Sequence, residues 1–456
     1  MDSPPDARPD AARDPADGCR VSLLAPHPRR TAVLVEHSSP PRLPTVRLDD
    51  EEPTLPEILA AAGHVVAPSA TVLRQVVTSP RQAQDELLLE LEAVATDPPS
   101  GWTWLDLDGD AIARLEPETS RAAVTSWARE RDEGWAPSRP AYSRPGWFAE
   151  ASAWMVDRMA AYGHPALAPP HQHHLWDVSV VLRASSAEGD LYLKCSNDRF
   201  RHEAVVTLAL AERMPGLAPD VVAVDADRGW LLMHDLGAPE LGEQDHALWP
   251  AGIAAHASIQ RTWLDRTDEL VGLGLSVRSL ADLAADVGRM TRDVGLLARM
   301  APELRTAWLA TASDLVTACR RLDLLGPGPT LVHGDLHPWN VTSGPDGTRV
   351  FDWTDAAVSH PCVDLATYVF RTEDVAVRRQ LVDAYVDAWS GVAPEETLRE
   401  AAALGLVVGA LYQVQTYRSL LPALPRDGAD AGLTGADVDW VDRSVTRYRL
   451  GLDAPR

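Results

Sequence analysis

Alternating apolar and polar positions predict short strands in the first third of the chain. Four strands are expected, at Thr31–Val35, Pro44–Leu48, Leu87–Val94 and Trp102–Leu107. A short helix is expected over Leu55–Ala62, because Pro56 suits a first helical turn. These elements predict a small α/β domain over residues 29–140. It contains no recognisable set of catalytic residues, and a structural or substrate-capping role is its simplest interpretation.

Two segments without periodicity flank this domain. Residues 1–28 are rich in Pro, Asp, Arg and Ala, which predicts a disordered tail. Residues 136–146 are rich in Pro and predict a linker. Large apolar residues then recur at helical spacing over Trp147–Tyr162, which predicts an amphipathic helix. We therefore assign residues 141–170 to a linker and a helix.

The rest of the chain changes from strands to helices. Residues 171–237 are strand-rich, and helical patterns dominate 238–456. Within the strand-rich part, strands are expected at Trp176–Ala184, Asp190–Cys195, Val221–Val224 and Trp230–Met233, and a helix at Arg201–Arg213. The order predicts an α+β protein in which a small β-rich part precedes a mostly helical part, with the α/β domain in front.

Composition excludes several classes of function. The 456 residues suggest two or three domains, and the formal net charge of −24 argues against a nucleic-acid partner or a polybasic membrane anchor. No apolar stretch is long enough to span a bilayer. The start at Met1–Asp6 has neither a basic nor an apolar segment, so we expect no secretory signal. Four widely spaced cysteines indicate reduced thiols, and we expect a cytoplasmic protein.

One residue count draws attention to a single position. Of 42 basic residues, 41 are Arg and only Lys194 is Lys. Codon bias explains the scarcity of Lys. The same bias makes Lys194 informative, because a Lys kept against it predicts a position where a compact ammonium cannot be replaced by a guanidinium.

The segments Leu331–Asn340 (LVHGDLHPWN) and Val350–Trp353 (VFDW) carry the clearest chemistry. A turn between them predicts a hairpin that places Asp335, Asn340 and Asp352 around one point. Transfer of a γ-phosphoryl group from ATP needs Mg²⁺ on hard oxygen ligands and a carboxylate that orients the attacking hydroxyl. The three side chains are of the types that this reaction requires.

The motif HGDLHPWN followed by FDW resembles the aminoglycoside phosphotransferase-like family of small-molecule kinases. The resemblance implies the protein-kinase-like two-lobed fold, with a β-rich N-lobe at 171–237 and a helical C-lobe at 238–456. It implies Asp335 as the catalytic base, Asn340 and Asp352 as ligands of Mg²⁺, and ATP as the phosphoryl donor.

The resemblance also implies nucleotide-binding residues upstream. Lys194 would grip the α- and β-phosphates, and Glu203 would hold Lys194 in place, although a first-turn Glu also favours a helix N-terminus by itself. A hinge between the lobes would face the adenine, and a plain strand end with a Gly turn is the alternative. The residues expected at this hinge are Met233, His234, Asp235 and Leu236.

Other polar residues near the motif have weaker assignments. His333 and Asp364 are expected to support the loop, and Trp339 and Trp353 to pack beneath it. Asp355 and His360 are candidates for facing substrate. A late helix offers further candidates for an acceptor pocket, namely Tyr412, Gln413, Gln415, Tyr417 and Arg418. The tract His171–His174 is interpreted as a loop cluster, because no acid or thiol completes a metal site.

The sequence thus predicts an ATP- and Mg²⁺-dependent kinase acting on a hydroxyl of a small molecule. An aminoglycoside or other amino sugar fits the acidic chain, but a neutral sugar, an amino alcohol or a macrolide fits the motifs equally well. The alternative is a catalytically silent nucleotide-binding or scaffolding protein, because residues 185–189 hold a single Gly where protein kinases have a Gly-rich loop. A protein kinase is disfavoured, since the chain between Asp352 and Pro361 is too short for a protein-kinase activation loop. The sequence leaves the oligomeric state open.

Overall fold

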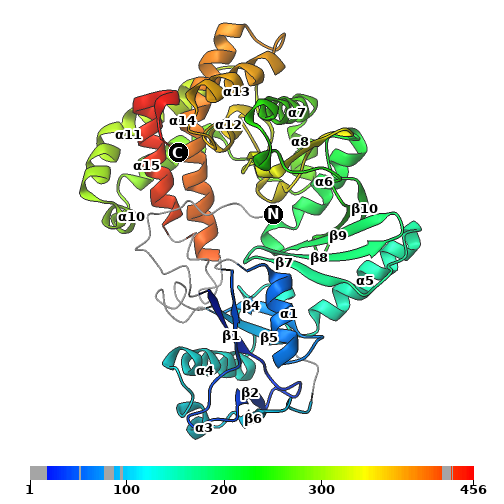
Figure 1. Cartoon of the computed structure of the whole chain (residues 1–456). Helices are drawn as coiled ribbons and strands as arrows, with labels where there is room; N and C mark the ends of the chain where they lie inside the picture. Colours follow the sequence, from blue (N-terminus) through cyan, green and yellow to red (C-terminus); the bar gives the residue numbers. More distant parts are fainter. Residues whose placement is uncertain are drawn as a thin grey trace. The chain divides into compact units, whose positions relative to one another are not determined.

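The computed structural model describes residues 18–50, 53–76, 87–92, 96–423, 433 and 435–455 (Figure 1). It divides into two compact units, each described here by itself. The N-terminal unit holds the described residues up to Asp198, and the C-terminal unit begins at Arg199 and includes the last helix. The division therefore falls inside the β-rich part of the sequence, and the lobe boundary expected at residue 237 stays a prediction.

A four-stranded sheet forms the first half of the N-terminal unit. Its order is β3 (Thr45–Leu48), β1 (Cys19–Leu24), β5 (Leu87–Glu92) and β4 (Thr71–Gln75), with β1 and β5 parallel and the other pairs antiparallel. Apolar residues of one face pack with α1 (Leu55–Val65) into a single core cluster. The strands form because their apolar residues alternate or run together between turn residues.

Four further elements cover the other side of this small domain. The strands β2 (Ala32–Glu36) and β6 (Trp102–Asp106) pair antiparallel. The helices α3 (Gly109–Ala113) and α4 (Glu118–Glu133) follow, and α4 buries Ala123, Val124 and Trp127 in a second core cluster. The predicted α/β character of this region agrees with these elements.

A buried network of charges lies in this domain; we call it the Glu90 network. The Glu90 carboxylate is fully buried and accepts hydrogen bonds from Arg74 (2.7 Å), Arg139 (2.9 Å) and the Trp127 indole (2.9 Å). Both arginines also bind Glu130, at 2.9 Å and 2.7 Å. The two carboxylates and two guanidiniums neutralise each other, as buried charges must.

The structure corrects the expected tail and adds elements that the pattern missed. Cys19–Leu24 forms a central strand whose residues Val21–Leu24 are buried, so the disordered assignment of 1–28 is wrong for that segment. Residues 1–17 lie outside the described part. The segment is short and includes the polar Ser22, and its Pro- and Arg-rich surroundings masked it. The strand β4 and the helices α3 and α4 were likewise not predicted.

The second half of the N-terminal unit is a helix and three antiparallel strands. The helix α5 (Trp147–Tyr162) has the predicted bounds. The strands are β7 (His171–Leu175), β8 (Ser179–Ser186) and β9 (Gly189–Ser196). The loop interpretation of His171–His174 is wrong, because this tract is a strand whose buried Gln172 side chain binds the backbone of Val72 on β4, at 2.8 Å and 2.7 Å.

The C-terminal unit begins with one helix and a hairpin and is otherwise mostly helical. The helix α6 (His202–Arg213) precedes the antiparallel strands β10 (Val221–Asp225) and β11 (Trp230–His234). Two small antiparallel pairs follow, β12 (Thr330–Val332) with β15 (Ala357–Ser359), and β13 (Val341–Gly344) with β14 (Gly347–Val350). The remaining helices are α7 (Trp249–Thr262), α8 (Thr267–Gly272), α9 (Leu280–Met290), α10 (Val294–Arg299), α11 (Pro302–Asp323), α12 (Leu365–Val369), α13 (Val375–Ala388), α14 (Glu395–Leu420) and α15 (Ala436–Leu450).

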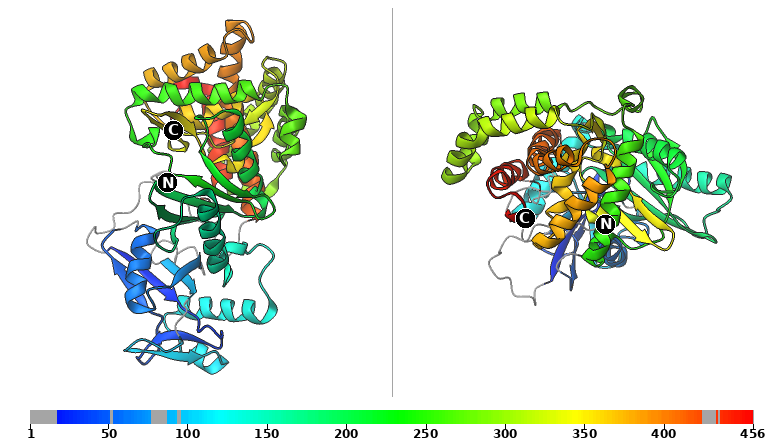
Figure 2. Two further views of the ribbon diagram at one scale, coloured as in Figure 1. Left: turned by 90° about the vertical axis from the view of Figure 1, so that its right-hand side faces the viewer. Right: turned by 90° about the horizontal axis from the view of Figure 1, so that it is seen from above.

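The long helix α14 organises the packing of this unit. It lies side by side with α15 (Figures 1 and 2) and contributes a largely buried stretch around Gly405–Val414 to the main core. A Cβ at Gly409 would lie 2.2 Å from the Val363 carbonyl oxygen, so glycine lets the helix approach this segment closely. The predicted α+β fold class, a sheet-rich part followed by a helical part behind an extra α/β domain, is confirmed. Within the described residues, the model has no helix with the length and apolarity needed to cross a membrane.

Candidate active site

The HGD segment turns sharply between β12 and β13, and the turn depends on Gly334. Its φ is +84°, and a Cβ there would lie 2.2 Å from the carbonyl oxygen of Asp355. Any side chain at this position would therefore clash with the backbone as well as strain it. Glycine is what allows the next residue, Asp335, to leave the end of β12 beside the segment that follows β14.

Hydrogen bonds to the Asp364 carboxylate hold this turn in place. Its buried carboxylate accepts the backbone amides of His333 (2.9 Å) and Gly334 (2.9 Å) and the side chains of His256 (2.7 Å) and Gln260 (3.1 Å). Burial alone would raise the pKa of Asp364, but the bond from His256 and the nearby imidazoles hold it below its usual value. The predicted supporting role of Asp364 is confirmed.

A second set of bonds joins the two motif segments. His333 donates from Nε2 to the Phe351 carbonyl (2.9 Å), and its Nδ1 accepts the Asp335 amide (3.4 Å). The Phe351 amide donates to the Asn340 carbonyl (3.0 Å), and the β13–β14 register pairs Val341 with Val350. The predicted hairpin therefore exists and brings Asn340 next to Phe351 and Asp352. His333 supports the loop, as predicted, and burial keeps its pKa low.

The residues predicted to hold Mg²⁺ have suitable donor atoms and constrained conformations. Asn340 donates from Nδ2 to the Asp335 carbonyl (3.0 Å), which directs the amide and leaves its oxygen as the ligand atom. Asp352 has a left-handed backbone, with φ +64° and ψ +62°, and its Oδ1 accepts the Thr354 hydroxyl (2.5 Å). Non-glycine residues adopt this backbone at a cost, typically where function requires it. One amide oxygen and one carboxylate fit a hard divalent cation.

Several carboxylates lie at this site, and the pKa values of two of them, Asp335 and Asp355, are raised. Burial, together with the charges of Asp335 and Asp352, raises the pKa of Asp355 to about 7 against the opposing effects of Arg278 and Arg199. The pKa of Asp335 is also raised, by burial and by Asp352 and Asp364, although 39% of its side chain is exposed. Such mutual repulsion is common where a cation or a proton is to be bound.

His337 completes the immediate surroundings of Asp335. Its Nε2 lies 3.7 Å from the Asp335 carboxylate, too far for a direct hydrogen bond. Burial places its pKa well below the usual value, so the ring is neutral. Trp339 lies against Gly242 and the ring of Trp249, and Trp353 is fully buried, as predicted.

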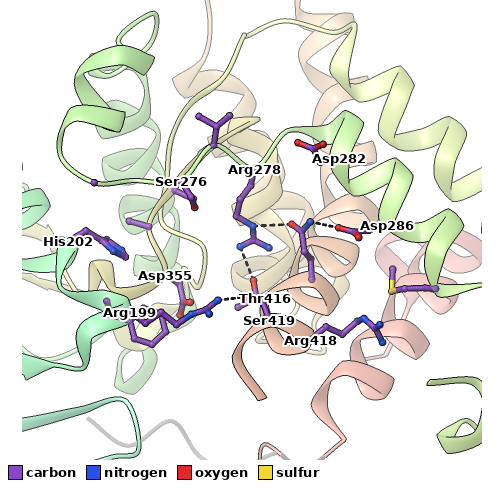
Figure 3. A pocket seen from close by; sticks show the side chains of 17 residues that line it. Arg199, His202, Ser276, Arg278, Asp282, Asp286, Asp355, Thr416, Arg418 and Ser419 are labelled. Carbon is purple, nitrogen blue, oxygen red and sulfur yellow. Dashed lines mark hydrogen bonds between the residues drawn. The ribbon is translucent and has the colours of Figure 1, made fainter. Parts of the chain in front are cut away.

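A pocket of about 690 Å³ opens beside these carboxylates within the C-terminal unit (Figure 3). Asp355 lines it from the motif side, and His202 and Arg199 line it from the start of α6. The opposite wall comes from the segment before α9, from α9 itself and from the end of α14. Its polar residues there are Ser276, Arg278, Asp282, Asp286, Gln415, Thr416, Arg418 and Ser419.

These features agree with what the family comparison finds. The model of the phosphotransferase enzyme family, APH, matches residues 172–403, just over half of the chain. This chain belongs to that phosphotransferase family. The matched range runs from β7 into α14 and contains the motif, the braced loop and most of the pocket. The predicted enzyme class, a small-molecule phosphotransferase with a hydroxyl acceptor, is confirmed, and the assignment agrees with the expected protein-kinase-like fold.

Solved structures with similar folds lie at low identity. A macrolide 2'-phosphotransferase, MphH, from Brachybacterium faecium is 21% identical, with 63% of this chain and 97% of that chain covered and a TM-score of 0.45. A choline/ethanolamine kinase family protein from Mesorhizobium loti is 16% identical, with 67% and 98% covered and a TM-score of 0.45. Nothing about the acceptor of this phosphotransferase follows from likeness at this level. No curated protein sequence matches the chain.

The predicted nucleotide-binding residues of the phosphotransferase divide between the two units. Lys194 is buried on β9 in the N-terminal unit, where it pairs across the hairpin with Val181. Glu203 is buried in the first turn of α6 in the C-terminal unit. Their pairing stays a prediction. At the expected hinge, Met233 and His234 end β11, and the His234 amide donates to the Asp220 carbonyl (3.0 Å). The neighbouring Asp235 carboxylate accepts the Gly237 amide (2.7 Å), and the Leu236 carbonyl lies 3.5 Å from Arg349.

The weaker candidates separate into pocket and supporting residues. Asp355, Gln415 and Arg418 line the pocket, as predicted. His360 does not face it: the ring is buried near the Leu325 carbonyl, and burial lowers its pKa to about 4. Gln413 is also buried and donates to the Gly334 carbonyl, so it supports the loop.

Sequence reasoning missed the arginines of the pocket wall. Arg199 and Arg278 both line it, and neither stands in a recognisable motif. With 41 arginines in the chain, no count or spacing distinguishes these two from the rest. A long-range contact brings Arg278 to the site. Its backbone amide donates a hydrogen bond to the carbonyl of Val358 on β15 (2.8 Å).

Proposed function

We propose that this phosphotransferase transfers the γ-phosphoryl group of ATP, with Mg²⁺, to a hydroxyl of a small molecule bound in the pocket beside Asp355. The observation that carries this proposal is the arrangement of Asp335. Its loop is fixed by Asp364 and Gly334, its pKa is raised, and its neighbours on the loop and hairpin are an amide and a carboxylate suited to a divalent cation.

Asp335 acts as the base that orients the acceptor hydroxyl and accepts its proton. Most of its backbone is fixed before substrate arrives, because the amide binds His333 and the carbonyl binds Asn340. Burial, with the charges of Asp352 and Asp364, raises the pKa of Asp335 against the opposing effects of Arg371 and His333, and the raised pKa favours proton acceptance. Fixed geometry and charge placement provide most of the rate enhancement in phosphoryl transfer.

Asn340 and Asp352 would hold the Mg²⁺ ion. When bound, this ion supplies positive charge that offsets the phosphate charge and the carboxylate repulsion. The left-handed backbone at Asp352 and the bond from Thr354 determine the direction of that carboxylate. The bond from Asn340 to the Asp335 carbonyl couples the ligand position to the base.

The nucleotide is held by Lys194, Glu203 and the segment 233–236. Lys194 binds the α- and β-phosphates, and Glu203 orients Lys194. Met233, His234, Asp235 and Leu236 provide backbone groups for the adenine. Support for these roles is the burial of Lys194 and Glu203, since a buried charge requires a partner of opposite sign. The cytoplasmic location predicted from the sequence belongs to the same proposal.

Acceptor-dependent release of ADP by the purified full chain tests this function. The assay includes Mg²⁺ and a panel of amino sugars, neutral sugars, amino alcohols, sugar acids and sugar phosphates. Wild type is compared with Asp335→Ala, Lys194→Ala and an exposed control, Arg321→Gln. We expect turnover in wild type and control, loss in both site variants, and retained Mg·ATP binding in Asp335→Ala. Turnover retained by Asp335→Ala would refute the assignment of the base. Mg·ATP binding without turnover on any acceptor would favour the silent nucleotide-binding alternative.

A further inference from the structure

Arg278 differs from the other charged residues of the pocket in the kind of partners it has. Its Nε donates to Gln415 Oε1 (3.0 Å), Nη1 to Thr416 Oγ1 (2.9 Å) and Nη2 to the Tyr412 carbonyl (2.9 Å). All three acceptors are neutral. Within the part of the chain that the structure describes, no carboxylate lies within salt-bridge distance of this half-buried guanidinium.

Neighbouring charges show the contrast. Arg418, on the same wall, binds the Asp293 carboxylate at 2.5 Å. Asp286 is bound by Arg289 at 2.9 Å and by the Gln415 amide at 2.5 Å. Asp282 accepts the hydroxyl of Ser279 at 2.6 Å. Gln415 therefore stands between Asp286 and Arg278 as a neutral amide, and Asp355, whose pKa the charge of Arg278 lowers, forms no salt bridge with it.

The guanidinium is also held rigidly. It lies 3.4 Å from the centroid of the Tyr412 ring, which fixes its plane. Its backbone is tied to β15, because its amide donates to Val358 (2.8 Å) and its carbonyl accepts the Ser359 hydroxyl (2.7 Å). A side chain fixed in this way loses little conformational entropy when a ligand binds.

The donor count leaves capacity for a ligand. A guanidinium has five N–H groups, and the three bonds to Gln415, Thr416 and Tyr412 leave two, one on each terminal nitrogen. Arg278 lines the pocket, and Figure 3 shows it pointing between Asp355 and Asp286. Two N–H groups on a rigid fork match the two oxygens of a carboxylate or a phosphate.

We propose that Arg278 is the specificity-determining residue of the acceptor pocket and binds an oxyanion, a carboxylate or phosphate, carried by the hydroxylated acceptor. The acceptor class is then an anionic polyol, such as a sugar acid or a sugar phosphate. A pocket of about 690 Å³ has room for a molecule of this size or larger. Asp355, which also lines the pocket and has no hydrogen-bond partner among the described residues, accepts hydroxyl groups of the same molecule.

This inference rests on the proposed function and excludes one of its options. A polycationic aminoglycoside would place ammonium groups against Arg278, which no carboxylate within salt-bridge distance neutralises. Of the three carboxylates that line the pocket, Asp286 is bound by Arg289 and Asp282 by the Ser279 hydroxyl, which leaves Asp355. The acidic net charge of the whole chain therefore does not describe the pocket.

Matched acceptor pairs test the proposal. Glucuronate and glucose 6-phosphate are each compared with glucose, and serine with ethanolamine, so that each pair differs mainly in one oxyanion. Wild type, Arg278→Gln and Arg278→Lys are assayed for kcat/KM, with Arg321→Gln as an exposed arginine control that binds Glu400 outside the pocket. Circular dichroism and thermal unfolding check that each variant folds.

We expect the anionic member of at least one pair to be the better substrate. Arg278→Gln should reduce its kcat/KM by roughly 30- to 300-fold, because charge-assisted bonds are lost, and leave the neutral member within about threefold. Arg278→Lys should retain part of the preference. The glucuronate and phosphate arms decide between a carboxylate and a phosphate. A preference for the neutral or cationic member in every pair, or an equal loss for both members in Arg278→Gln, would overturn the proposal.

A binding measurement distinguishes a failure of the proposal for Arg278 from a failure of the proposed kinase function. Calorimetry with the same compounds, in the presence of a non-hydrolysable ATP analogue and Mg²⁺, needs no turnover. If nothing is phosphorylated, the proposed kinase function fails. Weaker binding of the oxyanion compounds to Arg278→Gln than to wild type would still support the role of Arg278, and the same affinity, or no binding to either, would overturn it.

Discussion

The Glu90 network and the acidic group of Asp335, Asp352 and Asp355 differ in the ion-pair partners of their carboxylates. In the network, Glu90 and Glu130 bind Arg74 and Arg139 at 2.7–2.9 Å. In the acidic group, Asp335 has only His337 within 4 Å among the described basic residues, and that ring is neutral. The Glu90 network is neutralised by its own arginines, whereas no described basic side chain forms an ion pair with the Asp355 carboxylate and only the neutral His337 approaches that of Asp335.

The pKa values follow the same division. Burial would raise the pKa of Glu130, but the bonds from Arg74 and Arg139 bring it below its usual value. The pKa of Asp355 rises to about 7, because burial and like charges are not offset by a direct partner. Self-neutralised charges indicate a structural role, and unneutralised charges crowded together indicate a site.

The largest effect expected from this difference is at Asp352. Asp352→Asn replaces the charged ligand of the proposed Mg²⁺ ion with a neutral amide, so turnover should fall by about 1,000-fold. Steady-state kinetics over a range of Mg²⁺ concentrations measures this. The Mg²⁺ concentration for half-maximal rate should also rise. Unchanged kinetics at low Mg²⁺ would remove Asp352 from the proposed metal site.

The next largest effect is expected at Glu90, where a substitution should lower stability and leave activity unchanged. Glu90→Gln leaves Arg74 and Arg139 short of one buried negative charge, which should destabilise the N-terminal unit by about 3 kcal/mol. Urea unfolding measures the change, and kcat is measured below the transition. We expect kcat of the folded enzyme to stay within about twofold of wild type. A larger loss of kcat at unchanged stability would contradict a purely structural network.

A smaller effect concerns the pH dependence of stability. Because the pKa of Asp355 is higher in the folded state than its ordinary value of 3.8, the folded protein binds the proton more tightly between about pH 4 and pH 7. This contribution to stability is present at low pH and is lost as pH rises through 7. Asp355→Asn should therefore show a flatter decline of thermal stability over that range. Parallel curves for variant and wild type would show that Asp355 titrates normally.

The smallest effect is expected at an exposed pair. Arg321 binds Glu400 in the C-terminal unit at 2.7 Å, with about half of the arginine side chain exposed. Solvent screens such pairs, so Arg321→Gln should change the free energy of unfolding by less than about 1 kcal/mol and leave kcat unchanged. Urea unfolding and the standard assay check both. A loss comparable with that of Glu90→Gln would show that burial is not what distinguishes the network.

The sequence was sufficient for the local geometry of the motif. The spacing of Asp335, Asn340 and Asp352 around a turn was enough to predict the hairpin between β13 and β14 and the residues that flank it. Hairpins can be predicted in this way because short-range pairing and turn residues determine them. The supporting roles of His333 and Asp364 also followed from the motif. The helix α5 was predicted with its observed bounds, since its apolar spacing is regular and a Gly precedes and follows it.

Long-range packing was what the sequence did not reveal. The strand β1 is central only because β3 and β5 pair with it from elsewhere in the chain. The tract at His171–His174 is polar, and it is a strand because β8 pairs with it. Arg278 reaches the pocket through its bond to β15, some 80 residues later in the chain. Tertiary contacts decide such positions more than local propensity.

The most direct test of the division between the two clusters compares Asp335→Asn with Glu130→Gln in one assay. Both changes are isosteric and remove one negative charge. We predict that Asp335→Asn lowers kcat by about 1,000-fold or more with unchanged Mg·ATP affinity, because only the base is lost. Glu130→Gln should keep kcat and lose stability instead. Asp335→Asn with wild-type kcat, or Glu130→Gln with a comparable loss of kcat, would contradict the account.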